Sequence, residues 1–143
     1  MGDKRTSGRL DEFETRRLNH QATASFNRAD IEKVNPADTW QMLSRVPSVR
    51  FIPSGKTGSL LAISSRSMKI DPATLQAVPC FMSVMIDGVM AMGDIDGHFD
   101  MASLPPPEDI HGIEVFAGGA SIPVKYNGAG GDKMCGLIAI WTR

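Results

Sequence analysis

The chain has 143 residues, of which 42% are hydrophobic and 22% charged, and its formal net charge is −1. This length corresponds to one domain, and this composition is typical of a folded globule rather than of a disordered chain. Two cysteines are too few for a cysteine-rich scaffold or a four-thiolate zinc site, no apolar run reaches the ~18 residues that span a bilayer, and the balanced charge does not favour nucleic-acid binding.

The charge is unevenly distributed along the chain. Residues 1–70 carry a net +5 and residues 71–143 a net −6. Two interpretations stay open: a solvated globule with two differently charged faces, or a polarised surface that orients the domain against a partner. The first 19 residues contain nine charges of mixed sign. They predict a flexible N-terminal arm over residues 1–19, before one domain over residues 20–143. No apolar segment follows Met1, so we expect no signal peptide in this chain.

Two short helices are predicted after the arm. Asn27 followed by Asp30 is an N-cap with an acidic first turn, and it begins a helix that ends near residue 34. Asn35-Pro36 supplies a second cap with proline at the first helical position, and Pro47 ends that helix. The two segments together predict a helical hairpin.

About five strands are predicted, and one of them is central. The predicted strands are Val49–Ile52, Leu60–Ser64, Phe81–Ile86, Ile110–Phe116 and Leu137–Trp141. Asp87-Gly88 is a strong turn pair that stops the third strand. The last strand is apolar on both faces, which is typical of the interior of a sheet. The predicted fold class is therefore α/β (α+β): a small mixed sheet of about five strands with a short helical hairpin.

Two loops contain residues of the kinds found in ligand sites. Gly55-Lys56-Thr57 resembles a fragment of a phosphate-binding loop, but Arg50 stands where that motif needs glycine. Asp94, Asp96 and Asp100 surround Gly97, but the first and last ligand positions of an EF-hand loop are methionine and serine. We predict no cofactor and no metal site.

One histidine is a candidate catalytic group. His98 lies among the aspartates of the same loop and is a candidate acid/base group. No partnered nucleophile is near it in the sequence. The primary prediction is that the protein is not an enzyme, and a small enzyme using the His98 loop remains the third hypothesis.

A succession of short motifs extends over about residues 22–143. They are a helix followed by a proline turn, a hydrophobic strand ending in Asp-Gly, an Ile-Glu-Val strand with glycine turns, and a final Gly-plus-apolar strand. The segments are Thr39–Val49, Val84–Val89 with Asp87 and Gly88, Ile113-Glu114-Val115, Gly118-Gly119-Ala120, Tyr126-Asn127-Gly128 and Cys135-Gly136-Leu137. In order and spacing, this succession resembles the plug domain of TonB-dependent outer-membrane receptors.

The sequence also departs from the family pattern. Ser48 replaces the usual glycine after Pro47, and Gly119 replaces the usual proline after Gly118. In the receptors a large β-barrel begins about where this chain stops, so we expect this chain to lack a barrel. The resemblance implies a mixed sheet whose tasks are occlusion, ligand contact and docking rather than catalysis.

The resemblance also bears on the two cysteines. Cys80 and Cys135 each precede a predicted strand, and in a plug-like sheet these strands can lie close. A bridge requires Cα atoms within about 7 Å. In an oxidising periplasm we expect a disulfide between them; two buried free thiols acting as small apolar side chains are the alternative.

The function predicted first is that of a non-catalytic accessory subunit. In this hypothesis the plug-like domain docks on, or braces, a larger membrane-associated assembly for transport or electron transfer, outside the cytoplasmic membrane. The alternative is the plug of a TonB-dependent transporter, which occludes the barrel and contacts its ligand. Both hypotheses expect a protein partner, no nucleic acid, no transmembrane segment of the chain's own, and a periplasmic or outer-membrane location.

Overall fold

A central five-stranded sheet organises the molecule. A computed structural model describes residues 4–53, 59–91, 93, 98–118, 121–127 and 135–143. The helices and 3-10 turns are α1 (Lys4–Leu18), α2 (Arg28–Val34), α3 (Trp40–Leu43), η1 (Met101–Ser103), η2 (Pro107–Asp109) and α4 (Val124–Asn127). The strands are β1 (Ala24–Phe26), β2 (Val49–Pro53), β3 (Leu60–Ile70), β4 (Ala77–Phe81), β5 (Ser83–Ile86), β6 (Val89–Ala91), β7 (Ile110–Phe116) and β8 (Leu137–Thr142).

The large sheet has the order β1-β7-β8-β5-β6 and is mixed. Strand β8 pairs antiparallel with β7 on one side and parallel with β5 on the other. A parallel pair needs a crossover between its strands, and here the chain between β5 and β8 includes β6, β7 and α4. The prediction of a mixed sheet with Leu137–Trp141 inside it, paired with the strand near residues 113–116, is confirmed.

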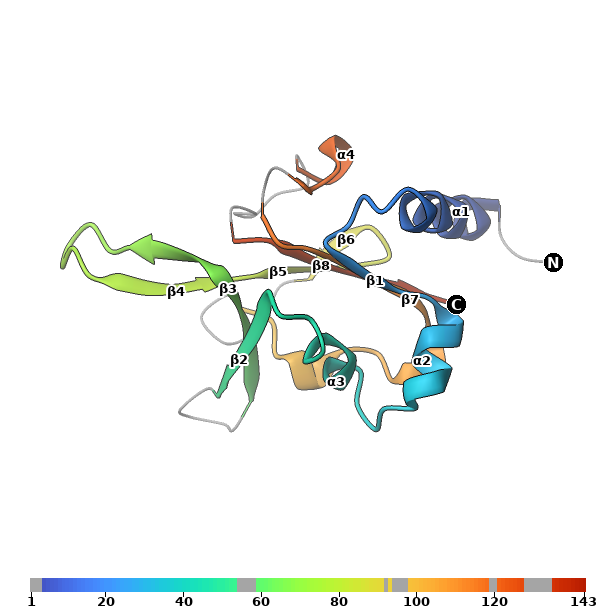
Figure 1. Cartoon of the computed structure of the whole chain (residues 1–143), viewed down its shortest axis with the longest axis horizontal. Coiled ribbons are helices and arrows are strands. Elements are labelled where there is room, and N and C mark those ends of the chain that lie inside the picture. Colours follow the sequence, from blue (N-terminus) through green and yellow to red (C-terminus); the bar gives the residue numbers. More distant parts are fainter. Residues whose placement is uncertain (1–3, 54–58, 92, 94–97, 119–120, 128–134) are drawn as a thin grey trace.

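Helices cover both faces of this sheet. In Figure 1, α1 and α4 lie on one side of it, and α2 and α3 lie on the other. Because side chains of a strand alternate between faces, β8 feeds both layers. Ile138 and Ile140 belong to the core cluster under α2 and α3, whereas Leu137, Ala139 and Trp141 belong to the cluster that contains Phe13 of α1.

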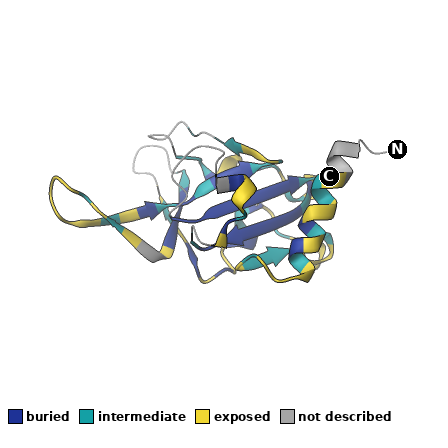
Figure 2. Ribbon diagram, turned by 90° about the horizontal axis from the view of Figure 1, so that it is seen from above, coloured by how far each residue is buried: buried dark blue, intermediate teal, exposed yellow. Residues whose placement is uncertain are grey.

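A second sheet, β2-β3-β4, is antiparallel throughout. Its first half packs against the body, since Ala62 is buried in the larger core cluster. The far half of the β3–β4 hairpin extends away from the body (Figures 1 and 2). The sequence predicted only the first five residues of β3, and its predicted strand Phe81–Ile86 covers β5 but only the last residue of β4.

The predicted helices are found in part. Helix α2 begins after Asn27, whose side chain accepts the Asp30 backbone N–H, while the Asp30 carboxylate accepts the Asn27 N–H. The predicted N-cap at Asn27 is therefore present, and the return hydrogen bond to Asp30, which was not predicted, completes a reciprocal capping box. The second helix is only Trp40–Leu43, much shorter than the segment between Pro36 and Pro47.

The expectation of a flexible arm over residues 1–19 differs from the structure. Residues 4–18 form α1, and its Phe13 is fully buried against the sheet. Gly112 of β7 makes this contact possible, because a Cβ there would lie 2.3 Å from the Phe13 ring. Mixed charge alone indicated a solvated segment, but Glu12, Glu14, Arg16 and Arg17 of α1 have charged partners in the fold.

Candidate functional site: a buried charge centre, motif turns and two open surfaces

A buried ion pair joins α1 to the middle of the sheet. The Glu114 side chain on β7 is fully buried, and both its oxygens accept hydrogen bonds from Arg16, at 2.9 Å from Nε and 2.9 Å from Nη2. Trp141 Nε1 on β8 donates a third hydrogen bond to Glu114, at 2.7 Å. A carboxylate with three donors is satisfied despite its burial, and the forked guanidinium fixes the position of the helix.

Aromatic rings complete the surroundings of this charge. The Arg16 guanidinium lies 5.4 Å from the Tyr126 ring centre and 5.5 Å from that of Trp141. Burial lowers the pKa of Arg16, but the hydrogen bonds and charge of Glu114 outweigh this and raise that pKa above its ordinary value. Arg16 therefore stays cationic wherever the fold persists. The same desolvation raises the pKa of Tyr126, although the positive charge of Arg16 opposes it.

Further contacts hold the exposed side of α1. Lys125 Nζ of α4 lies 2.7 Å from Glu12, and this hydrogen bond is the main cause of the raised pKa of Lys125. Glu14 lies 3.4 Å from His111 on β7. Sequence reasoning placed Glu114 in a motif but missed Arg16, because the two residues are 98 positions apart in the chain.

The Asp87-Gly88 pair forms the two-residue turn between β5 and β6. Both residues have positive φ, +52° and +86°, and Ile86 pairs directly with Val89. This geometry is that of a type I′ hairpin, which Asp-Gly favours. The Asp87 carboxylate also accepts hydrogen bonds from the backbone N–H and side-chain hydroxyl of Thr142. The turn therefore ties the end of β8 to the β5–β6 hairpin.

Gly136 is a second motif glycine whose conformation the structure explains. Its φ is +105°, and a Cβ there would lie 2.7 Å from the Phe116 carbonyl oxygen. No other residue combines this conformation with this approach at low cost. Gly118 has open space at the position of a Cβ. Gly119 and Gly128 lie outside the described residues.

The two cysteines lie at the junction of the sheets. Cys80 of β4 and Cys135, just before β8, form a disulfide with a Cα–Cα distance of 5.2 Å. Both residues are buried, at 1% exposure each. The bridge connects the three-stranded sheet to the central strand of the other sheet.

The loops tested for chemistry are only partly described. His98 stacks on Phe81, with ring centres 3.9 Å apart. The Asp100 carboxylate accepts the backbone N–H groups of Ala102 and Leu60, so it caps η1 and ties the loop to β3. Asp94, Asp96 and Gly97, like Gly55-Lys56-Thr57, lie outside the described residues. Among the residues that are described, no three metal-ligating side chains come together.

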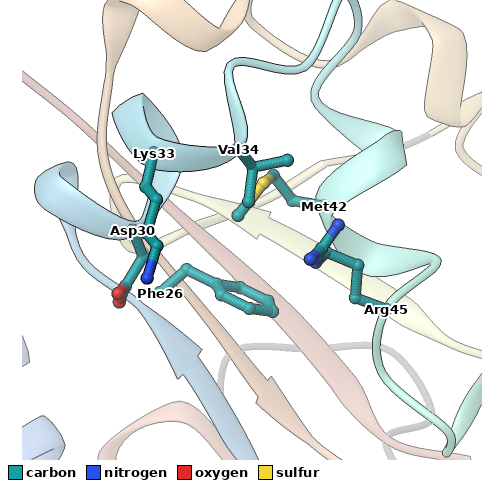
Figure 3. A pocket seen from close by; sticks show the side chains of 6 residues that line it. All are labelled: Phe26, Asp30, Lys33, Val34, Met42 and Arg45. Atoms are coloured by element: carbon teal, nitrogen blue, oxygen red, sulfur yellow. The ribbon is translucent and has the colours of Figure 1, made fainter.

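An open pocket of about 480 Å³ lies between β1, α2 and α3. Its lining comprises Phe26, Asp30, Lys33, Val34, Met42 and Arg45. In Figure 3 the Phe26 ring lies between Lys33 and Arg45. Three lining side chains are apolar, two are cationic and one is acidic.

The extended β3–β4 hairpin is a second open surface. Three large apolar side chains on it are strongly exposed: Met68, Ile70 and Leu75, the last at 79%. Leu75 also has a φ of +57°, in the left-handed region that a leucine seldom adopts. Pro79 lies on β4, the outer strand, where it lacks the N–H that strand pairing would use. The surface is therefore suited to side-chain contact rather than strand addition.

The comparisons with known proteins agree with the motifs. A family model described as the TonB-dependent Receptor Plug Domain matches residues 15–131. Neither the curated proteins nor the solved structures give a significant match. Over the described residues, no helix is both long and apolar enough to cross a bilayer.

Proposed function

Because the chain belongs to the TonB-dependent receptor plug domain family, we propose that it occludes the lumen of an outer-membrane β-barrel. The match over residues 15–131 is the observation that supports this proposal. Plug domains are non-catalytic elements of transporters that pack into such barrels, in association with the outer membrane or the periplasm. We also propose that this chain has no catalytic role.

The surface of the domain suits this task. The interior of an outer-membrane barrel is polar, so a body that fits inside needs a polar exterior. The outer side of α1 presents Asp11, Glu12 and Thr15 as exposed residues. Its inner side is fixed by Phe13 and Arg16. Because these contacts fix the helix, its exposed polar side chains form a rigid surface that can face the interior of a barrel.

Site-specific photo-crosslinking in the outer membrane tests this proposal. A photoreactive amino acid at Asp11 is expected to give an adduct with an outer-membrane β-barrel protein. That barrel, reconstituted in a planar bilayer, is then expected to conduct ions alone and to lose conductance when the chain is added. An adduct with a soluble protein, or a conductance that the chain leaves unchanged, would contradict occlusion.

A second candidate function rests on the β3–β4 hairpin. Exposed apolar groups clustered at one end of a projecting element are typical of a protein contact. We infer that Met68, Ile70 and Leu75 dock the domain on a larger membrane-associated assembly, as an accessory subunit. The double variant Ile70→Ser, Leu75→Ser is expected to lose its association with that assembly while its thermal midpoint stays the same. Retained association would count against docking through the hairpin, and barrel occlusion does not depend on this result.

The state of the two cysteines tests the proposed periplasmic location. We propose that the Cys80–Cys135 bridge exists in the native protein, because structural disulfides persist in oxidising compartments such as the periplasm. Its geometry fits a bridge, since the Cα atoms are 5.2 Å apart. Intact mass without reductant is expected to be lower by about two hydrogens than the mass after reduction. If protein purified from its native source and denatured without reductant contains two thiols that can be alkylated, both the bridge and this argument for the periplasm are contradicted.

A further inference from the structure

The pocket between β1, α2 and α3 carries unpaired positive charge. Three arginines on the helices have carboxylate partners: Arg16 pairs with Glu114, Arg17 with Glu14, and Arg28 with Glu32. In the part of the chain that the structure describes, Lys33 and Arg45 form no ion pair and no side-chain hydrogen bond, yet both line this pocket. The pocket therefore offers two cations that have no charged or hydrogen-bonding partner among the residues that the structure describes.

The single acidic group at the pocket is already engaged. The Asp30 carboxylate accepts the Asn27 backbone N–H at 2.9 Å, within the capping box that begins α2. Asp30 also lies at the positive end of the helix, which offsets part of its charge. Lys33, one turn further along α2, forms no salt bridge with it within the described residues. The lining therefore has a net charge of +1, and Lys33 and Arg45 favour a negatively charged ligand.

The floor between the cations is apolar. Met42 is fully buried, and Phe26 and Val34 are partly buried members of the core that still face the pocket. A ligand that covered this floor would remove apolar surface from water, and an anionic group on it would reach the cations. A volume near 480 Å³ falls within the range of about 300–1,000 Å³ that is usual for small-molecule sites.

We propose that this pocket binds a small organic anion that combines one carboxylate with an apolar chain or ring. Lys33 and Arg45 hold the carboxylate, and Phe26 and Val34, which pack over Met42, contact the apolar part. The site is separate from the charge centre of α1, because the Glu114 side chain belongs to the opposite face of the sheet. The proposal does not depend on barrel occlusion, since it needs only the folded domain.

Octanoate and its neutral analogue 1-octanol test this proposal on the full chain. Titration of each, followed by the backbone amide signals in nuclear magnetic resonance, gives a Kd and the location of binding. Octanoate is expected to shift amides of residues 26–34 and 40–45, and octanol to bind more weakly. Lys33→Gln and Arg45→Gln are each expected to raise the Kd of octanoate about threefold to tenfold, the range expected for the loss of one partly exposed charge contact.

Arg50→Gln is the matched control. Arg50 lies on β2, is exposed, has no ion pair among the described residues, and does not line the pocket. All three variants change exposed side chains, so their thermal midpoints are expected to stay close to that of the parent protein. The proposal is overturned if octanoate does not bind, if octanol binds equally well, or if Arg50→Gln weakens binding as much as the two pocket variants.

Discussion

Replacing Glu114 with glutamine tests whether the buried ion pair holds α1 in place. Glutamine keeps the shape and one acceptor oxygen, but it removes the charge opposite Arg16, whose side chain is only 8% exposed. Leaving one member of a buried pair unpartnered costs about 3–5 kcal/mol. Glu12, 3.9 Å from Arg16 and half exposed, can compensate in part. We therefore expect a loss of about 3 kcal/mol, at the lower end of that range.

Urea denaturation followed by circular dichroism measures this loss. With a slope near 2 kcal/mol/M, a loss of about 3 kcal/mol lowers the urea midpoint by about 1.5 M. Glu32→Gln is the control, because it removes a carboxylate from the Arg28–Glu32 pair, which lies at the surface with Glu32 61% exposed. That change is expected to cost at most about 1 kcal/mol.

A double-mutant cycle separates the pair from its surroundings. Arg16→Met removes the charge that Glu114→Gln leaves unpaired, so the double variant is expected to be more stable than the two single losses predict, by at least about 1 kcal/mol. Amide hydrogen exchange in residues 9–18 is expected to accelerate in Glu114→Gln, because α1 opens more often. A midpoint shift below about 0.3 M, or additive single losses, would show that the ion pair does not hold the helix.

Three further outcomes follow from individual contacts. Gly112→Ala is expected to cost about 2 kcal/mol or more in urea denaturation, because its Cβ would meet the Phe13 ring at 2.3 Å, and much less in a Phe13→Ala background. Gly136→Ala is expected to destabilise by at least about 2 kcal/mol, since it adds strain at φ +105° to a backbone clash; an unchanged midpoint would refute this. The pKa of Tyr126 is raised in the folded state, so the unfolded chain loses its phenolic proton at a lower pH than the folded protein. The free energy of unfolding is therefore expected to fall as pH rises above about 10, and to fall less in Tyr126→Phe. Equal alkaline losses in the two proteins would contradict this cause.

The central strands were predictable because their signals are local. Leu137–Trp141 is apolar at every position but alternates between two cores, and this doubly buried pattern occurs only inside a covered sheet. Asp87-Gly88 determines its own turn, because both residues tolerate positive φ. The family motifs overlap the same segments, so the resemblance and the residue patterns predicted the same central sheet.

The elements that were missed depend on distant partners. Strand β1 has three residues and gains its regular structure only by pairing with β7. Helix α1 has a weak apolar stripe, of which Phe13 is the buried member, and its main anchor is Arg16. The sequence alone does not reveal that Arg16 forms an ion pair with Glu114. The pocket was missed for the same reason, since Lys33 and Arg45 are exposed cations whose lack of partners is a tertiary property.

The position of α1 determines which surface of this plug domain a barrel wall would contact. The family match begins at residue 15, within the helix, whereas Phe13, the side chain that fills the space over Gly112, precedes it. On that face the sheet presents Phe116, Leu137 and Trp141, all buried members of the core cluster that contains Phe13. These apolar side chains are unsuited to the polar interior of a barrel, because contact there would leave them against water or charged groups. In the proposed occlusion, with α1 docked, the wall would meet a charged helix instead. Loosening the helix through Glu114→Gln is therefore expected to weaken occlusion as well as stability, whereas the control Glu32→Gln, on the opposite side of the sheet, leaves conductance block unchanged.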